Sequence, residues 1–330
     1  MLTLGIETSC DETACAVLDG SDKIRSNVIS SSLFRHRPFG GVVPEIASRH
    51  CLEQIDFVFQ EALSQGRIKP GDLDLVAVTQ GPGLIGSLLV GIVFAKTFSY
   101  QMGIPLVGVN HLEAHLVANF IGSRKPSRFI GLLVSGGHTG LYLCEKGGCA
   151  LLGETVDDAV GEAYDKTAKM MGLGYPGGPI MDRLAAEGNS KKYSFTKPKQ
   201  KNRFAFSFSG IKTAVLYRIR DRKRVTQAFR RDMAASFQRA VVSWLVDKAL
   251  DAARAKQAKH IVVGGGVSAN SELRRVLNSE AAKHGIRVWF PTFELTMDNA
   301  AMIARRGVDL YKQGKRDTLT LTGDPNFKVT

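Results

Sequence analysis

The chain has 330 residues, 44% hydrophobic and 23% charged, a composition typical of a folded α/β protein with room for two domains. Lys and Arg number 44 against 31 Asp and Glu, a formal charge of +13, which favours polyanionic partners. No run of 18 apolar residues predicts a membrane span, and the start of the chain does not resemble a secretory signal. The five cysteines include no C-x-x-C, which argues against a disulfide framework or a thiolate zinc site and favours a reducing cytoplasm.

Two stretches of the chain share one order of predicted elements. Residues 2–31 form a strand, a polar loop, a strand, a turn and a strand, and residues 129–155 repeat that order. Asp-Gly and Gly-Gly at the turns are hairpin signals. Both stretches lead into alternating helices and strands. This indicates a duplicated α/β domain whose small-residue loops would face one another across a cleft; the alternative is a chance similarity of two hairpins.

The remaining elements follow in chain order. After the first stretch we expect a helix over 44–64, a strand over 73–79, a helix over 85–100, a strand over 105–109 and a helix that carries two histidines. After the second stretch we expect helices over 157–171 and 178–187, a basic insertion, helices over 208–220 and 226–256, strands from His260 and Ile286, and helices from Asn270 and Asp298.

Three loops rich in small residues follow predicted strands. The first is "ETSCDET", the second "SGGHT", and the third lies in "VVGGGVSANSELR", residues 262–274, where a strand leads into a helix. Backbone N–H groups in such loops and at helix starts bind phosphates or nucleosides. No Gly-Lys-Ser/Thr follows, which argues against P-loop chemistry but not against nucleotide binding.

The basic insertion is the most unevenly charged part of the chain. Residues 191–231 contain 14 Lys or Arg and a single acid, Asp221. Seven aromatic residues interleave with them: Tyr193, Phe195, Phe204, Phe206, Phe208, Tyr217 and Phe229. Cations attract phosphates and exposed rings stack on unpaired bases, so the region predicts a nucleic-acid surface. The alternative is a solvated basic face with the Phe residues buried.

His111 and His115 are spaced to lie on one face of a helix. Imidazoles suit Fe, Zn or Ni, and a carboxylate would complete the ligand set; the alternative is that both are packed or capping residues. In the HExxH motif of zinc proteases the glutamate directly follows the first histidine. Here Glu113 comes two positions later, roughly 200° around the helix. We therefore expect Glu113 to be structural or to contact another element, which removes the base a peptidase would need.

Nine motifs together carry a resemblance. They are "GIETSCDET", "GGVVPEIASR", "QGPGLIGSLLVG", "HLEAH", "LLVSGGHT", "DDAVGEAYDKTAKMMGLGYPGGP", "FSFSGIKTA", "VVGGGVSAN" and "MDNAAMIA". Essentially end to end, the chain resembles the TsaD family of tRNA threonylcarbamoyladenosine biosynthesis proteins, formerly mislabelled glycoproteases. The resemblance implies an actin/Hsp70/sugar-kinase (ASKHA, ribonuclease H-like) fold, in agreement with the duplicated units. We expect an N-terminal lobe over 1–127 and a C-terminal lobe over 128–330. The basic helical insertion would span about 188–232, and the last helix would return toward the N-terminal lobe.

The resemblance also implies a reaction. The family transfers a threonylcarbamoyl group from threonylcarbamoyl-AMP to the exocyclic amine of the adenosine 3′ of the anticodon, in tRNAs that read codons beginning with A, and AMP leaves. His111, His115 and Asp298 match the metal ligands of the family. The metal is usually given as iron, so Fe(2+) is expected, with Zn(2+) or Mg(2+) as alternatives.

Further site residues come from the same resemblance. The substrate loop matches Val134, Ser135, Gly136, Gly137 and His138, and the remaining ligand contacts match Asp165, Gly178, Asp182 and Asn270. The two carboxylates would hold a ribose-like diol, with the Asn270 loop on the adenine side. Asp11 and Glu12 are the nearest carboxylates for late proton loss or for contacts behind the metal; the alternative is that they cap loop amides. Where the family commonly has Cys-Thr before the last ligand, this chain has Thr296 and Met297, which could alter the metal preference.

The implied partners are tRNA, TsaB and TsaE, with a TsaC-type enzyme supplying the adenylate; mitochondrial members use fewer partners. A cytoplasmic protein with no membrane association is expected. Three other functions stay open: a metallopeptidase, a non-catalytic nucleotide-binding scaffold, and, on fold alone, a small-molecule kinase.

Overall fold

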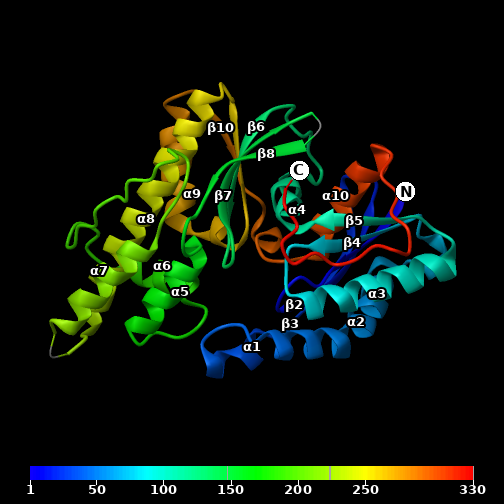
Figure 1. The fold of residues 1–330 in the computed structure, drawn as a ribbon, viewed down its shortest axis with the longest axis horizontal. Helices are drawn as coiled ribbons and strands as arrows, with labels where there is room; N and C mark the ends of the chain where they lie inside the picture. The colour runs from blue at the N-terminus through cyan, green and yellow to red at the C-terminus, as the bar shows by residue number, and fades with distance from the viewer. Residues whose placement is uncertain (147, 223, 330) are drawn as a thin grey trace. The chain divides into compact units, whose positions relative to one another are not determined.

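The computed structural model describes residues 1–146, 148–222 and 224–329. Outside the described residues lie Gly147, in the predicted second hairpin turn, Lys223, in the basic region, and Thr330. The chain divides into two compact units (Figure 1). Unit 1 comprises Met1–Lys125 and Met297–Thr330, and unit 2 comprises Pro126–Thr296.

Five strands form the sheet of unit 1. Along the chain they are β1 (Leu2–Glu7), β2 (Glu12–Asp19), β3 (Lys23–Ser31), β4 (Leu75–Gly81) and β5 (Leu106–Asn110). In space the order is β3-β2-β1-β4-β5. The first three strands form an antiparallel meander, whereas β4 lies parallel to β1 and β5 parallel to β4. The loops that follow β1, β4 and β5 therefore leave the sheet at the same edge, where ligands bind in open α/β sheets.

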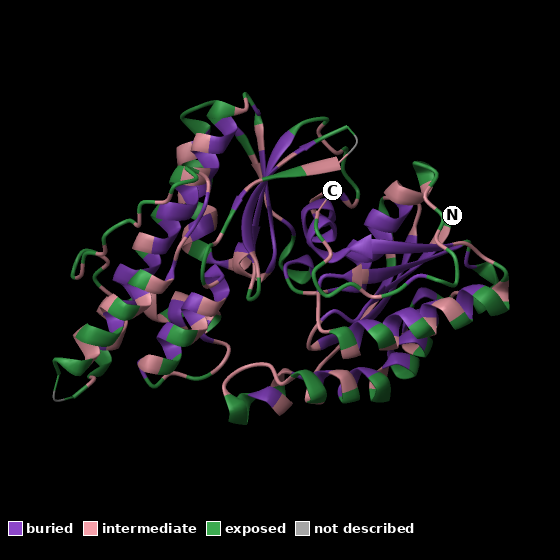
Figure 2. Ribbon diagram, viewed as in Figure 1, coloured by how far each residue is buried: buried purple, intermediate pink, exposed green. Residues whose placement is uncertain are grey.

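Helices pack on both faces of this sheet (Figure 2). They are α1 (Leu33–His36), α2 (Pro44–Gly66), α3 (Ile85–Met102), α4 (His111–Val117) and α10 (Ala300–Lys312), with 3-10 turns at Arg37–Phe39, Pro70–Asp72 and Ala118–Phe120. Leu4 and Ile6 of β1 join the core that α2 and α3 cover. Gly5 faces the opposite way, and a Cβ there would lie 2.2 Å from the Ala300 carbonyl oxygen. The alternation of β1 thus buries large side chains on one face and admits the backbone of α10 against the other.

Unit 2 has the same strand plan as unit 1. Its strands are β6 (Phe129–Val134), β7 (Thr139–Glu145), β8 (Gly148–Glu154), β9 (His260–Gly264) and β10 (Arg287–Trp289), in the order β10-β9-β6-β7-β8. Again an antiparallel meander, β6-β7-β8, is extended by strands in parallel, β9 beside β6 and β10 beside β9. Two mixed sheets of one order and sense confirm the predicted duplication of an α/β domain.

The helices of unit 2 bury a second core. They are α5 (Val160–Met170), α6 (Gly177–Ala185), α7 (Ser209–Arg220), α8 (Gln227–Ala255) and α9 (Ser271–Ala282), with 3-10 turns at Gly266–Ala269 and Phe293–Leu295. Phe237 and Trp244 of α8 pack in this core with Ile130 and Leu132 of β6. Residues Met233–Gln238 of α8 are buried in succession, so the middle of this helix is enclosed on all sides, as expected for a helix that packs between other helices and the sheet.

The aromatic residues of the basic region are mostly inside the protein. Phe206, Phe208 and Phe229 are no more than 3% exposed. Tyr193, Phe195 and Phe204 pack, partly buried, against the same core. Of the seven, Tyr217 alone counts as exposed, at 56%. The expectation of exposed rings is therefore wrong for most of this segment, and the alternative of buried Phe residues is confirmed: the chain alternates cations on the surface with rings that anchor the segment to unit 2.

Two further features differ from expectation. Helix α3 is long and apolar enough to cross a membrane by length and composition; because Leu88, Ile92 and Ala95 lie in the core of unit 1, it is a core helix of that unit. Cys144 and Cys149 form a disulfide, with Cα atoms 4.0 Å apart. They are directly paired residues of the β7–β8 hairpin, a register that counting cysteines does not reveal.

Candidate active site

The two histidines are positioned by the junction between β5 and α4. Asn110, the last residue of β5, caps α4: its Oδ1 accepts hydrogen bonds from the N–H groups of Leu112 and Glu113. Its Nδ2 donates to the carbonyls of Phe327 and Lys328, so the C-terminal segment holds the cap in place. A side-chain cap fixes where a helix begins. Helix α4 therefore starts at the edge of the sheet, with His111 and His115 one turn apart.

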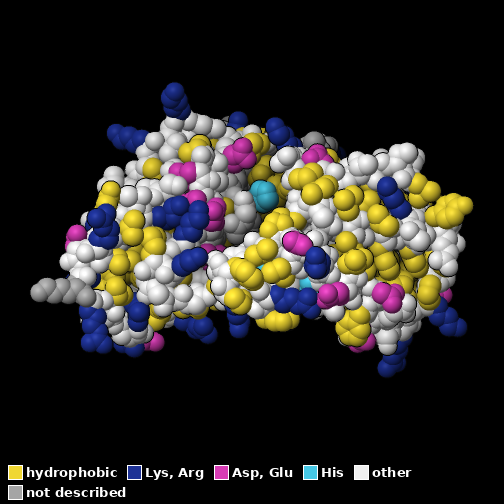
Figure 3. Space-filling model, turned by 60° about the horizontal axis from the view of Figure 1, so that its bottom comes forward, with side chains coloured by type: hydrophobic (Ala, Val, Ile, Leu, Met, Phe, Trp, Pro, Cys, Tyr) yellow, Lys and Arg dark blue, Asp and Glu magenta, His cyan; other side chains and the backbone are white. Residues whose placement is uncertain are grey.

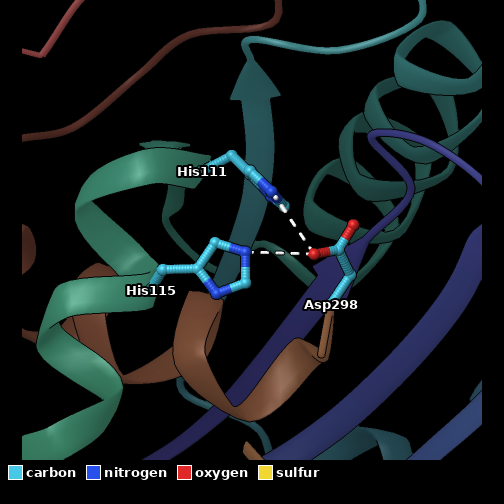
Figure 4. A group of neighbouring side chains, drawn as sticks. All are labelled: His111, His115 and Asp298. Carbon is cyan, nitrogen blue, oxygen red and sulfur yellow. Dashed lines mark hydrogen bonds and ion pairs between the residues drawn. The ribbon is translucent and has the colours of Figure 1, made fainter. Parts of the chain in front are cut away.

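Asp298 adds a carboxylate to the two histidines, and it comes from the second chain segment of unit 1, which begins at Met297. It lies just before α10, where Asn299 caps the helix by accepting from the N–H of Met302. One oxygen of Asp298, Oδ1, lies 3.0 Å from His115 Nε2 and 3.5 Å from His111 Nε2 (Figure 4). The ligand atoms of the three residues lie within 4.8 Å of one another. Two buried imidazoles and a carboxylate so placed fit a divalent metal ion.

Two carboxylates flank the ring of His111. Burial alone would lower the pKa of this imidazole, but Glu7 and Asp298 outweigh it and raise the pKa to about 9. Without a metal, the ring therefore carries a proton on each nitrogen at neutral pH. Metal binding must displace the proton on Nε2, since a ligand nitrogen has to offer its lone pair.

Glu113 lies on the opposite side of α4 from the two histidines of the candidate metal site. Its carboxylate is buried, and its Oε2 accepts a hydrogen bond of 2.8 Å from Arg306 Nε on α10. The prediction that Glu113 serves the fold or another element, rather than a metal-bound water, is confirmed. The arrangement lacks the glutamate position of the HExxH peptidases.

The loop between β1 and β2 brings further carboxyl groups toward Asp298. Glu12 is buried, and its Oε1 accepts a hydrogen bond from Ser31 Oγ. Burial, followed by the charges of Asp11 and Asp298, raises the pKa of Glu12 well above its usual range. Burial and the same carboxylates also raise the pKa of the Cys10 thiol. Asp11 and Glu12 thus share one electrostatic environment with Asp298 of the candidate metal site.

Thr296 and Met297, the positions that depart from the family pattern, are not alike. Thr296 is buried, and its hydroxyl donates to the carbonyl of Phe293, 2.7 Å away, which closes the 3-10 turn. Met297 is 52% exposed. The first residue therefore stabilises the turn before the ligand, and the second presents its side chain to solvent.

In unit 2 the predicted substrate loop is a tight turn after β6. The N–H of Ser135 donates to the carbonyl of His138, and the N–H of His138 donates to Ser135 Oγ. Gly136 and Gly137 are exposed at its tip. Two glycines of other elements pack directly against the backbone of this turn, because they have no Cβ. A Cβ on Gly161 would lie 2.7 Å from the Ser135 carbonyl oxygen, and one on Gly265 only 2.5 Å from the Val134 carbonyl oxygen.

The remaining predicted ligand contacts are engaged within unit 2. Asp165 Oδ1 accepts from the N–H of Gly177, and Gly178 also donates to this carboxylate. Burial raises the pKa of Asp165 in spite of these bonds. Asp182 Oδ1 accepts from Asn270 Nδ2 at 3.2 Å, so two residues far apart in the sequence meet. Each carboxylate thus sits at the start of a helix, α6 for Asp165 and α9 for Asp182.

Several side chains in contact with these residues were not singled out from the sequence. Gln238, inside α8, donates to Asp182 Oδ1 and accepts from Asn270 Nδ2. In unit 1, Glu7 and Ser9 contact His111 Nδ1. Glu7 and Ser9 stand in the quoted motif "GIETSCDET", which was the available signal; Gln238 stands in no motif and shows no signal in the sequence.

Comparison with known proteins decides the family. The family model "TsaD: tRNA N6-adenosine threonylcarbamoyltransferase" matches residues 23–305. The chain belongs to the TsaD family. A relative named tRNA N6-adenosine threonylcarbamoyltransferase from Thermosipho africanus is 49% identical over the full length of both chains. A protein of the same name from Dictyoglomus turgidum is 47% identical, covering 99% of this chain and 98% of its own. The TsaD resemblance and its transferase activity are thereby confirmed.

Solved structures support the fold of this TsaD protein. Full-length HypF, in a phosphate- and nucleotide-bound form, matches 95% of this chain and 47% of its own with a TM-score of 0.62 and 12% identity. A ROK family glucokinase from Streptomyces griseus matches 95% of this chain and all of its own with a TM-score of 0.53 and 13% identity. At such low identity these neighbours establish the ASKHA-like fold alone.

Proposed function

We propose that this enzyme transfers the threonylcarbamoyl group of threonylcarbamoyl-AMP to the exocyclic amine of the adenosine 3′ of the anticodon, in tRNAs that read codons beginning with A. A bond forms between the carbamoyl carbon and N6, the bond from that carbon to the phosphate oxygen breaks, and AMP leaves. The convergence of His111, His115 and Asp298 in a chain of the TsaD family carries the proposal.

The three ligands suit Fe(2+), which two histidines and one carboxylate bind in many enzymes with positions left open. Zn(2+) is the alternative that imidazoles also favour, and Mg(2+) fits the nitrogen ligands less well. When bound, the ion supplies positive charge for phosphate and carbonyl oxygens. The chain's own contribution is a set of two buried imidazoles on α4 and a partly buried carboxylate just before α10.

The nucleotide part of the substrate is assigned to unit 2. Exposed backbone at Gly136 and Gly137 suits an anionic or polar group, because glycine leaves the N–H groups accessible. Asp165, Gly178, Asp182 and Asn270 are proposed to contact the ribose and adenine. Asp182 and Asn270 already meet in this structure, which supports their acting together.

The acceptor amine is a weak nucleophile, so positioning contributes most to the rate, and proton removal comes late. We assign that proton to Glu12 or Asp11, in the loop beside Asp298. The raised pKa of Glu12 supports this assignment, since a carboxylate with an elevated pKa is a better base near neutral pH.

The proposed partners are tRNA, TsaB, TsaE and a TsaC-type enzyme that supplies the adenylate. The many cations of residues 191–231 suit tRNA phosphates. Hydrophobic side chains reach the surface of unit 1, in the right-hand part of Figure 3. Among them are Leu52 and Phe57 of α2 and Leu89, Val93 and Tyr100 of α3. Such an apolar surface supports a protein partner such as TsaB. A cytoplasmic location is proposed because tRNA is the substrate.

The test is mass analysis of nucleosides from tRNA incubated with the purified protein, its proposed partners, threonine, bicarbonate, ATP and a TsaC-type enzyme. We expect threonylcarbamoyladenosine with wild type and with His284→Ala, which removes an exposed histidine outside the site. His111→Ala should abolish both the product and the bound metal. Unmodified adenosine in every combination of partners would reject the proposal, and retained product after metal loss would favour a nucleotide-binding scaffold around another catalyst.

A further inference from the structure

We propose that Glu7 is a positioning residue for the metal: it holds His111 in the tautomer that directs the Nε2 lone pair to the ion. The inference rests on the metal centre proposed above. It goes beyond the three proposed ligands, because it says that Glu7, the last residue of β1, increases the affinity of the site for the metal.

Glu7 is completely buried, and both of its oxygens are occupied. Oε1 accepts from the backbone N–H of Ser9, and Oε2 accepts from Thr79 Oγ at 2.6 Å. The same Oε2 lies 2.9 Å from His111 Nδ1. Ser9 follows β1 and Thr79 belongs to β4, so the carboxylate is fixed by two neighbouring strands. A buried carboxylate is costly unless it is hydrogen-bonded on all sides, and here the donors supply that compensation.

The geometry leaves one arrangement for the His111 ring. An ionised carboxylate only accepts hydrogen bonds, so Nδ1 must carry the hydrogen that it shares with Glu7. Ser9 Oγ, 3.2 Å from Nδ1, can accept the same hydrogen as a second partner. Nε2 is then the ligand nitrogen, and it is the atom that faces Asp298 Oδ1. A carboxylate behind a metal-binding imidazole both orients the ring and strengthens it as a donor.

His115 has no equivalent support. Its Nε2 also faces Asp298 Oδ1, but its Nδ1 is buried and has no hydrogen-bond partner among the residues that the structure describes. The two imidazoles are therefore unequal at Nδ1: that of His111 has a carboxylate partner, whereas that of His115 has none among the described residues. Asp298 and Glu7 together also supply two negative charges, which balance a divalent ion in a buried site.

The experiment compares metal affinity, at one fixed pH, by competition of Zn(2+) or Co(2+) against a chelator. Glu7→Gln should weaken affinity about 10- to 100-fold and shift the visible absorption bands of the cobalt form. Thr79→Val, which removes one donor from Glu7 but keeps its charge, should weaken affinity by a smaller factor. This second variant serves as the test if Glu7→Gln does not fold.

Glu113→Gln is the matched control. Glu113 is a buried carboxylate on α4, the helix of the two histidines, but it pairs with Arg306 and not with either histidine. Glu113→Gln should lower Tm and leave metal affinity and the cobalt spectrum unchanged. If Glu7→Gln and Thr79→Val keep the affinity and spectrum of wild type, or lose no more than Glu113→Gln, Glu7 is merely structural and the inference fails. If wild type itself binds neither ion, the metal centre fails with it.

Discussion

His111 links the metal site to the stability of unit 1. In the metal-free protein its folded-state pKa of about 9 exceeds the usual value of 6.5. A raised pKa means that the folded state holds the proton more tightly than the unfolded state. The resulting stabilisation is complete below pH 6.5 and is lost as pH rises toward 9. A shift of this size corresponds to about 3 kcal/mol.

We therefore predict that the metal-free protein loses unfolding free energy between pH 6.5 and 9, and that His111→Ala removes most of this dependence. Urea unfolding in the presence of a chelator, repeated across that pH range, measures it. His284→Ala provides the control, since this histidine is exposed and belongs to unit 2, whereas Glu7 and Asp298 belong to unit 1. An unchanged pH profile in His111→Ala would show that the charges of Glu7 and Asp298 do not act on this ring.

At the scale of elements, the short helix α4 depends on its cap. Asn110 closes the first turn and is itself held by the C-terminal segment. Asn110→Ala should cost about 1 kcal/mol of stability and, because the first ligand is the next residue, should also weaken Zn(2+) binding. Thr226→Ala removes a comparable cap, from α8 in unit 2, and should cost similar stability without any change in Zn(2+) affinity. Equal metal affinity in the two variants would mean that the cap does not position His111.

The turn after β6 depends on a glycine of another element. Gly265 has φ +91, and a Cβ there would meet the Val134 carbonyl. Gly265→Ala should displace the 134–138 loop and weaken AMP binding by roughly tenfold or more, as measured by calorimetry. Gly285→Ala also places alanine at positive φ, but in open space, and should reduce stability by about 1 kcal/mol while AMP binds as in wild type. Matching AMP affinities would argue against the loop as the nucleotide site.

The same elements show what the sequence could and could not predict. The strand–loop–strand repeat and the His111–His115 spacing are local patterns in the sequence. The duplicated domain and the shared helix face of the two histidines could therefore be predicted. Asp298 came from the resemblance. Glu7 and Thr79 reach His111 only because β1, β4 and β5 are neighbours, and no periodicity encodes that pairing. The Cys144–Cys149 disulfide depends likewise on the register of one hairpin.

For the whole molecule, the +13 charge predicts an anionic partner but does not say where it binds. Composition could not separate rings that stack on bases from rings that anchor a segment, because both kinds alternate with cations. The structure assigns most of the rings of residues 191–231 to the core of unit 2. Recognition of tRNA by this segment should therefore rest on phosphate contacts, which salt screens strongly.

The cations of residues 191–231 differ in whether they form ion pairs within the protein. Lys197 and Arg203 are paired with Asp247 and Asp251, whereas Lys199 and Lys201 are exposed and form no ion pair among the described residues. The double change Lys199→Ala with Lys201→Ala should weaken tRNA binding and reduce the slope of log affinity against log salt by about 2. The control is the double change Lys23→Ala with Lys312→Ala in unit 1, which lowers the net charge by the same amount. If both pairs alter the salt slope alike, tRNA responds to the overall charge and the 191–231 segment is not its contact surface.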